Sequence, residues 1–191
     1  AAAMGEGYFR VVTQYSADDT FDQDIRIEKI NNPFSVYLDP NHQRVDGSDA
    51  KYALITEMVP KEDFEERFGK EFDATELETG TGDEQVFWNE EEKVRVAEFW
   101  EISQTEKTLY LMQDGSTVEG EKPEGAIRER KVLAPKVTQY ILTGSEVIET
   151  NEWPGKYIPI IKVTGDELWI EGKRYTFGLI RFAKGPQQMY N

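Results

Sequence analysis

Nucleophilic catalysis by a Ser–His or Cys–His pair would have to use His42, because this is the single histidine of a chain that has no cysteine. His42 lies in a turn-rich stretch, and no serine stands in the Gly-x-Ser-x-Gly arrangement that exposes a nucleophile. A catalytic base also needs a third group that orients it. We therefore interpret His42 as a solvated loop histidine and expect no catalytic residue.

The residues around His42 offer a better hypothesis, which is a metal site. Asp39, Asn41, Asp46 and Asp49 present oxygen atoms of the kind that bind a hard cation such as Ca²⁺. Their spacing departs from the EF-hand loop, which places ligands at alternate positions and a glutamate at the twelfth. Asp and Asn are also common turn residues. The sequence therefore favours a structural turn, and we expect no metal and no cofactor.

Other chemical signatures are missing from the sequence. It contains no Walker A loop, no dinucleotide-binding glycine pattern and no zinc-ligand spacing. Adjacent acidic residues such as Glu65 and Glu66 carry no glycosidase signal in a chain with 37 acidic residues. The one basic cluster, Arg128, Arg130 and Lys131, offers few phosphate contacts. We expect a protein that is not an enzyme.

The net charge of −15 indicates a solvated acidic surface that keeps the protein soluble. Tight binding along a DNA backbone is disfavoured, because it depends on Lys and Arg that neutralise phosphates. Aromatic residues make up 12% of the chain, which is enough for a hydrophobic core. No signal-peptide pattern and no apolar run long enough to span a bilayer occurs, so we expect no membrane partner.

The elements that must position these residues are clearest between Asp24 and Gly69. Residues 25–30 alternate, with Ile25, Ile27 and Ile30 expected to face inward. Further strands are predicted over 8–15, 34–38 and 52–58. A helix is predicted from Pro60, with Phe64 and Phe68 on one face and Gly69 as its stop.

The second half of the chain has the same strand-and-turn character. Strands are predicted over residues 93–104, 109–112, 136–143, 146–149, 157–163, 168–170 and 174–177. Pro159 favours an edge position or a bulge for its strand, rather than the centre of a sheet. Residues 70–92 are predicted to form an acidic surface excursion, and 117–135 a charged connection. The fold class is α+β: a β-rich antiparallel sheet, either a partly open barrel or a sandwich, with one or two short helices.

The domain organisation follows from the same pattern. Residues 1–5 look like a leftover of cloning or a cut end, and 6–191 like a single domain. Pro186 is expected to open a helix that is cut at Asn191.

Four stretches in order resemble the portal (head-to-tail connector) proteins of tailed bacteriophages, in particular the short-tailed type. They are DIRIEKINNPFSVYLDPNHQRVDGSDAKYALI at 24–55, VRVAEFWE at 94–101, LTGSEVIETNEWPGKYIPIIKVTG at 142–165 and GLIRFAKGPQQMYN at 178–191. The chain departs from the family pattern at Gly185 and Gln188, where an acidic and a basic residue are expected.

The resemblance implies a structural role in the virion, with assembly in the host cytoplasm. The resemblance implies a homo-oligomeric ring of about a dozen subunits at one capsid vertex, although closed symmetry by itself allows many orders. The terminase pumps DNA through this ring, without sequence-specific binding, and capsid and tail adaptor proteins are further partners. This chain would be a β-rich wing-type fragment outside the stem helices, and monomeric when alone.

Two other functions remain open at this point. The first is a non-catalytic β-sandwich binding module for protein or carbohydrate, in which exposed Trp88, Trp100, Trp153 and Trp169 would be sugar platforms. Trp100 and Trp169 lie in alternating strands and are expected in the core, which weakens this alternative. The second is a hydrolase with an acidic site, for which no residue stands out.

Overall fold

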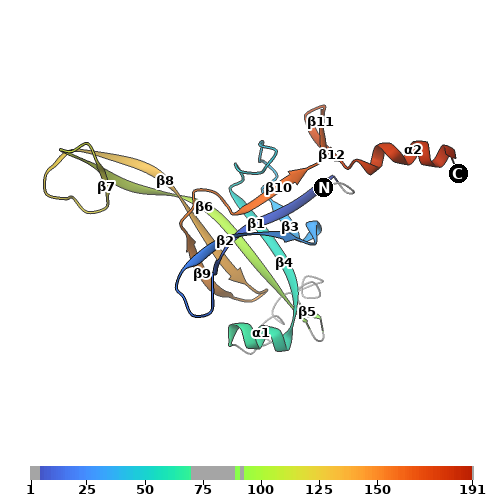
Figure 1. Ribbon diagram of the computed structural model, residues 1–191, viewed down its shortest axis with the longest axis horizontal. Coiled ribbons are helices and arrows are strands. Elements are labelled where there is room, and N and C mark those ends of the chain that lie inside the picture. The colour runs from blue at the N-terminus through green and yellow to red at the C-terminus, as the bar shows by residue number, and fades with distance from the viewer. Residues whose placement is uncertain (1–4, 70–88, 91–92, 191) are drawn as a thin grey trace.

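A computed structural model describes residues 5–69, 89–90 and 93–190 (Figure 1). Antiparallel sheets dominate, and the two α-helices are short. The predicted β-rich antiparallel α+β class is therefore confirmed, and the described residues form no closed barrel. The acidic excursion predicted at 70–92, including Trp88, lies almost entirely outside the described residues.

The largest sheet has seven strands, and its centre is formed by two long ones. The main strand order is β3 (Val36–Leu38), β4 (Tyr52–Pro60), β6 (Lys93–Met112), β8 (Ala126–Leu142) and β9 (Val147–Trp153). Two short strands, β5 (Asn89–Glu90) and β7 (Thr117–Glu119), also pair with β6. We call this assembly the central sheet.

A second, three-stranded sheet packs against the central sheet. Its order is β10 (Ile160–Thr164), β1 (Glu6–Tyr15) and β2 (Gln23–Ile30), so β10 is an edge strand, as the position of Pro159 predicted. The hydrophobic core lies between the two sheets. Its buried members are Tyr8, Val36, Ala53, Trp100, Val137, Ile158 and Ile160.

Polar contacts accompany this core at two places. Glu98 on β6 accepts hydrogen bonds from the Trp100 indole (2.8 Å) and the Gln139 amide (2.7 Å), and pairs with Arg10 of the three-stranded sheet (3.4 Å). Glu6 pairs with buried Lys162 at 2.8 Å, and burial beside this carboxylate raises the pKa of Tyr8 to about 12. The Arg10–Glu98 pair joins the two sheets, and the Glu6–Lys162 pair joins β1 to β10.

Helix α1 (Lys61–Phe68) covers the other end of the central sheet. Phe64 is buried against Val94, Val96 and Ile141, and its ring lies 5.0 Å from that of Phe68, as the i, i+4 spacing predicted. The helix ends at Gly69, which adopts a left-handed φ of 63° and donates its N–H to the Glu65 carbonyl. Pro60 is the residue before the helix.

Several predicted boundaries were wrong. Residues 33–35 form a 3₁₀ turn, η1 (Pro33–Ser35), because the Asn32 side chain accepts the Phe34 N–H. Residues 93–104 and 109–112 are one continuous strand, and most of the predicted connection at 117–135 belongs to β7 and β8. Helix α2 (Ile180–Tyr190) begins six residues before Pro186, which lies inside it.

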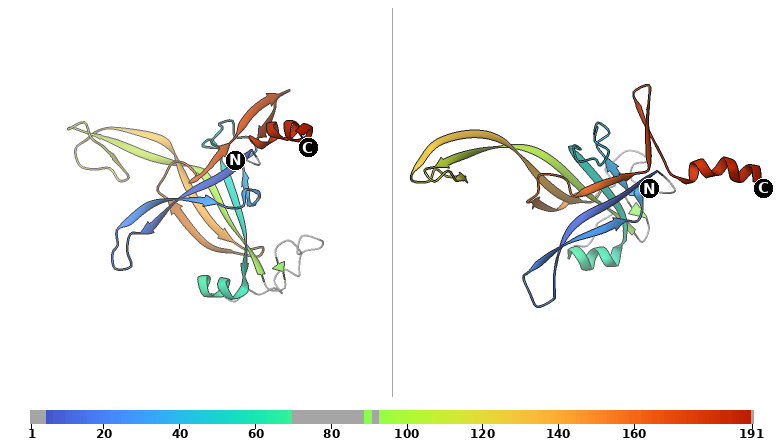
Figure 2. Two further views of the ribbon diagram at one scale, coloured as in Figure 1. Left: turned by 45° about the vertical axis from the view of Figure 1, so that its right-hand side comes forward. Right: turned by 45° about the horizontal axis from the view of Figure 1, so that its top comes forward.

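The β6–β8 pairing continues far beyond the core. Residues 103–136 project from the body as a twisted ribbon that includes β7 and ends in the turn around Gly115 (Figure 1, left). We call this ribbon the arm. On the opposite side of the molecule, the two-stranded hairpin of β11 (Asp166–Ile170) and β12 (Lys173–Phe177) and helix α2 leave the body (Figures 1 and 2).

The packing of α1 leads to a first prediction. Replacement Phe64→Ala is expected to lower the free energy of unfolding by about 3 to 5 kcal/mol, because it leaves a cavity between the helix and the sheet. Glu66→Ala, on the exposed side of the same helix, should change it by less than about 0.5 kcal/mol. Urea denaturation measures both. Equal effects of the two substitutions would contradict the docking of α1 through Phe64.

Candidate interaction surfaces

The carboxylates of the Asp39–Asp49 loop point at backbone amides of the loop itself. Asp39 is 3% exposed, and its two oxygens accept the N–H groups of Asn41 (2.9 Å) and Lys51 (3.2 Å). The Asn41 N–H is the main reason that the pKa of Asp39 lies below its ordinary value, against the opposing effect of burial. Asp39 therefore fixes the start and the end of the loop.

Two further aspartates brace the middle of this loop. Asp49 accepts the N–H groups of Gln43 (2.7 Å) and Arg44 (3.1 Å), and Asp46 accepts that of Ser48 (3.1 Å). These bonds lower the pKa of each carboxyl. Among the described residues no group of three or more His, Cys, Asp or Glu side chains is placed to hold a metal ion. The geometry supports the structural turn that the spacing favoured.

His42 is buried, so its interpretation as a solvated loop histidine was wrong. Its Nδ1 lies 2.6 Å from the Asp39 carbonyl oxygen, and its Nε2 lies 2.6 Å from Nη2 of Arg174 on β12. A guanidinium only donates, so Nε2 is the acceptor and Nδ1 carries the proton. The ring therefore connects the loop to the β11–β12 hairpin. Arg174 also lies over the Trp169 ring, 5.7 Å from its centre, and 4.0 Å from Glu167.

The three tryptophans of the described residues do not form a row of sugar platforms. Trp100 is 4% exposed and its ring meets that of Trp153 edge-on at 5.8 Å. Trp100 thus lies in the core as predicted. Trp169 is 57% exposed, so its predicted core position was wrong.

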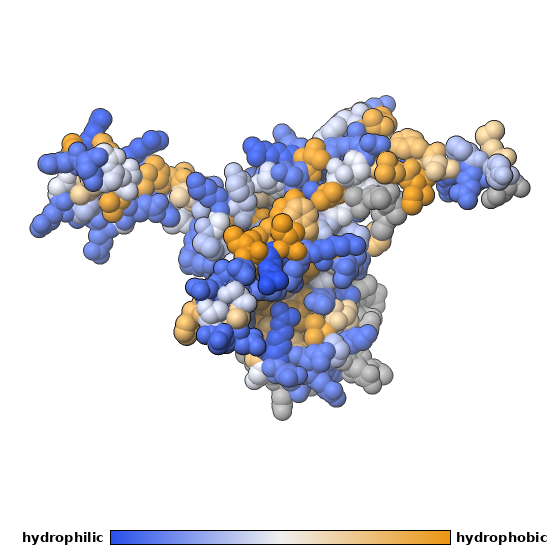
Figure 3. Space-filling model, in the orientation of Figure 1, coloured by the Kyte–Doolittle hydropathy of each residue, from blue (hydrophilic) through white to orange (hydrophobic). Residues whose placement is uncertain are grey.

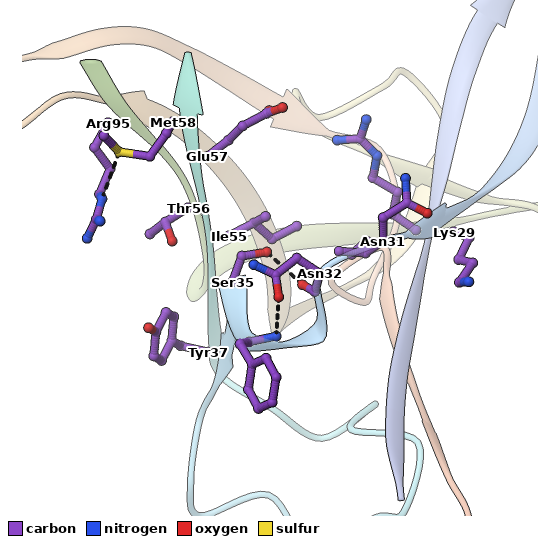
Figure 4. Close-up of a pocket in the computed structure, with 13 residues that line it drawn as sticks. Lys29, Asn31, Asn32, Ser35, Tyr37, Ile55, Thr56, Glu57, Met58 and Arg95 are labelled. Carbon is purple, nitrogen blue, oxygen red and sulfur yellow. Dashed lines mark hydrogen bonds between the residues drawn. The ribbon is translucent and has the colours of Figure 1, made fainter. Parts of the chain in front are cut away.

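A shallow groove lies between the β2–η1 turn and strands β4 and β6 (Figure 4). Lys29 and Arg95 contribute its cations, together with Arg10, whose guanidinium is already held by Glu28 (2.9 Å). Arg95 donates from Nε to the Met58 sulfur at 3.4 Å (Figure 4). No histidine lines the groove, and it is open to solvent. This hollow offers a contact surface, with no oriented pair of acid and base.

The outward side of the three-stranded sheet is apolar. Orange side chains run across the middle of the molecule over β1, β2 and β10 (Figure 3). Strand pairing places Ile27 across from Val11, and Phe9 across from Ile161, on one face. We call this surface the outer face. Its members are Phe9, Val11, Ile25, Ile27, Ile161 and Val163.

Sequence reasoning missed the outer face because it gave Ile25, Ile27 and Ile30 the same orientation. Ile25 and Ile27 share one side of β2, while Ile30 is an odd number of residues away and faces the other side. Ile30 packs against the core, whereas Ile25 and Ile27 are 75% and 72% exposed. Their predicted inward orientation was therefore wrong. An exposed apolar face of this kind is a candidate surface for contact with another molecule.

The arm presents a basic and apolar face. Arg128 lies directly across from Leu111, and Arg130 across from Leu109, so all four side chains share one side of the ribbon. Neither arginine forms an ion pair with a described residue. Lys131, the third member of the predicted cluster, lies on the opposite side and pairs with Glu106 at 3.1 Å. The cluster is thus divided between two faces.

Comparison with known proteins gives a consistent result over the whole chain. The family model described as "Phage P22-like portal protein" matches residues 1–191. The portal protein of Acyrthosiphon pisum secondary endosymbiont phage 1 is 26% identical over 209 residues. That alignment covers 98% of this chain and 29% of the relative, so the chain spans less than a third of the relative's length. None of the helices in the described part is long and apolar enough to cross a membrane.

The role of Asp39 can be tested by pH. Asp39→Asn should lower the free energy of unfolding at pH 7 by about 1 to 3 kcal/mol, because an NH₂ group then replaces one of the two buried carboxylate oxygens that accept backbone N–H groups. The folded-state pKa of Asp39 is lowered, so its contribution is complete above the ordinary aspartate pKa and is lost as pH falls through the folded value. The difference between wild type and variant should therefore shrink in acid.

Denaturant titrations from pH 7 to pH 3 measure this difference. Asp114→Asn is the control, since Asp114 also accepts a backbone N–H, from Ser116, but in an exposed turn. A gap between wild type and Asp39→Asn that stays constant down to pH 3 would contradict the assignment.

The contact between His42 and Arg174 is expected to stabilise the β11–β12 hairpin. An isolated two-stranded hairpin is marginally stable, so Arg174→Ala should accelerate amide hydrogen exchange in residues 166–177 by about tenfold or more. Lys173→Ala, at the neighbouring exposed position, should leave exchange nearly unchanged. Unaltered protection in Arg174→Ala would show that the hairpin is held by other contacts.

Proposed function

Because this chain belongs to the phage P22-like portal protein family, we propose that it forms part of the ring at the capsid vertex through which DNA is packaged and ejected. The observation that carries the proposal is the family match over all 191 residues. The family is structural and non-catalytic, in agreement with the expectation from the sequence. As a portal protein the chain is part of the phage virion.

We assign the described body to a wing-type region outside the ring's channel-lining stem. Helix α2 supports this assignment, because it leaves the body on the side opposite the arm and buries none of its residues (Figure 2). Its exposed apolar side chains, among them Phe182 and Met189, need a partner in the assembled protein. In the full-length protein α2 leads into the stem helices. Residues 6–191 then act as one structural unit.

The partners of the full-length ring are the other subunits, the terminase, the capsid and the tail adaptor proteins. Assembly takes place in the host cytoplasm. The net charge of −15 is consistent with passage of DNA, since an acidic wall does not hold phosphates.

The test is the state of assembly of two chains. Full-length protein is expected to form closed rings in electron micrographs. The 191-residue chain alone is expected to be monomeric by native mass spectrometry, because little interface remains to offset the entropy lost on association. A full-length chain that stays monomeric under all assembly conditions would contradict the proposed function.

A further inference from the structure

We propose that the arm of one copy docks on the outer face and the β1–β2 hairpin of a second copy. This inference rests on the proposed ring and names a contact that joins its subunits. Each copy would use its arm toward one neighbour and its outer face toward the other. This is a head-to-tail arrangement, which closes into a ring when the rotation between copies permits.

The arm is built to reach a neighbour. From Ser103 to Met112 its extended backbone spans about 30 Å at the usual rise of a strand. No hydrogen bond or ion pair between described residues joins it to the β1–β2 hairpin of its own chain, and the two point in different directions (Figures 1 and 2). A ribbon of this length without a covering layer is marginal by itself. The neighbouring subunit would supply that layer.

The outer face supplies the apolar side of the contact. Its exposed isoleucines, Ile25 and Ile27, continue to the hairpin tip, where Phe21 is 96% exposed. Leu109 and Leu111 on the arm are matching apolar side chains, each directly across from one of the two arginines. Burial of such side chains on both partners is favourable at roughly 25 cal/mol per Å².

Charge selects the partner surface. The hairpin tip carries four aspartates, and none of them forms an ion pair with a described residue. They are Asp18, Asp19, Asp22 and Asp24. Arg128 and Arg130 on the arm lack acidic partners in the same way, so the two sets complement each other across the contact.

The net charge of the arm points to the same pairing. Residues 103–136 contain six basic and six acidic residues, so the arm is neutral and the net charge of −15 belongs to the rest of the chain. The acidic body of another copy therefore repels the neutral arm less than it repels an average segment of this chain.

Charge reversal in the full-length protein tests the contact. Arg128→Glu with Arg130→Glu should raise the protein concentration needed for ring assembly by about tenfold or more, because two new carboxylates would then face the four aspartates of the hairpin tip. Adding Asp19→Lys and Asp22→Lys to the same chain should restore assembly. Lys131→Glu is the matched control: it reverses a charge of the same arm on the opposite side and should leave assembly unchanged.

A second measurement does not depend on charge. The substitutions Ile27→Cys and Leu111→Cys should give a disulfide between subunits under mild oxidation, because docking brings the two positions together. The 191 residues contain no other cysteine that could compete. Circular dichroism of every variant establishes that its strands are intact. A cross-link within one chain only, or none, would overturn the proposal.

The outcomes separate this inference from the proposed function. Rings that assemble normally from the Arg128→Glu, Arg130→Glu chain would overturn arm docking and leave the ring intact. If those rings instead lose retained DNA or the attached tail proteins, the arm faces these partners and docking on a second copy is equally overturned. A wild-type chain that forms no ring contradicts the proposed function itself, and arm docking with it.

Discussion

The structure depends on one long antiparallel ladder between β6 and β8, whose register shifts only between Leu111 and Met112. It runs from Ala97 opposite Leu142 to Met112 opposite Ala126. In its first part the side chains of Trp100 and Val137 are buried between two sheets, so both the ladder and the core hold the strands. In its second part the core has ended and the backbone hydrogen bonds continue without it. The same two strands therefore build the body and carry the arm out of it.

This ladder explains why sequence patterns predicted the elements of the body better than those of the arm. Alternation of apolar and polar residues reports a half-buried sheet, and residues 93–100 show it because they border the core. The stretch from Arg128 to Lys131 is charged on both sides, so it was interpreted as a connection. Cross-strand pairing of such residues requires a partner strand, and the partner is not apparent from local composition.

In the loop at Asp39–Asp49, too, some features could be predicted from the sequence and others could not. Its role as a turn followed from the usual chemistry of Asp and Asn, and the structure supplies the backbone amides that these carboxylates accept. The position of His42 could not be deduced in this way. Its partner Arg174 is 132 residues away in sequence, and only the fold brings the two within 2.6 Å. The orientation of Ile25 and Ile27 was within reach of the sequence, because counting residues from Ile30 separates the two faces.

An acidic chain with exposed apolar faces must satisfy two opposing requirements. Each copy carries a net charge of −15, and the repulsion between copies opposes aggregation. It does so although the apolar side chains of Phe21, Ile25 and Ile27 are exposed. Ordered assembly then needs a surface on which this repulsion is locally reversed. In the proposed contact, the neutral arm with its two arginines beside leucines would be such a surface. The same negative charge would keep the other exposed apolar residues of the body apart, so in the proposed contact specificity would arise from where the cations lie.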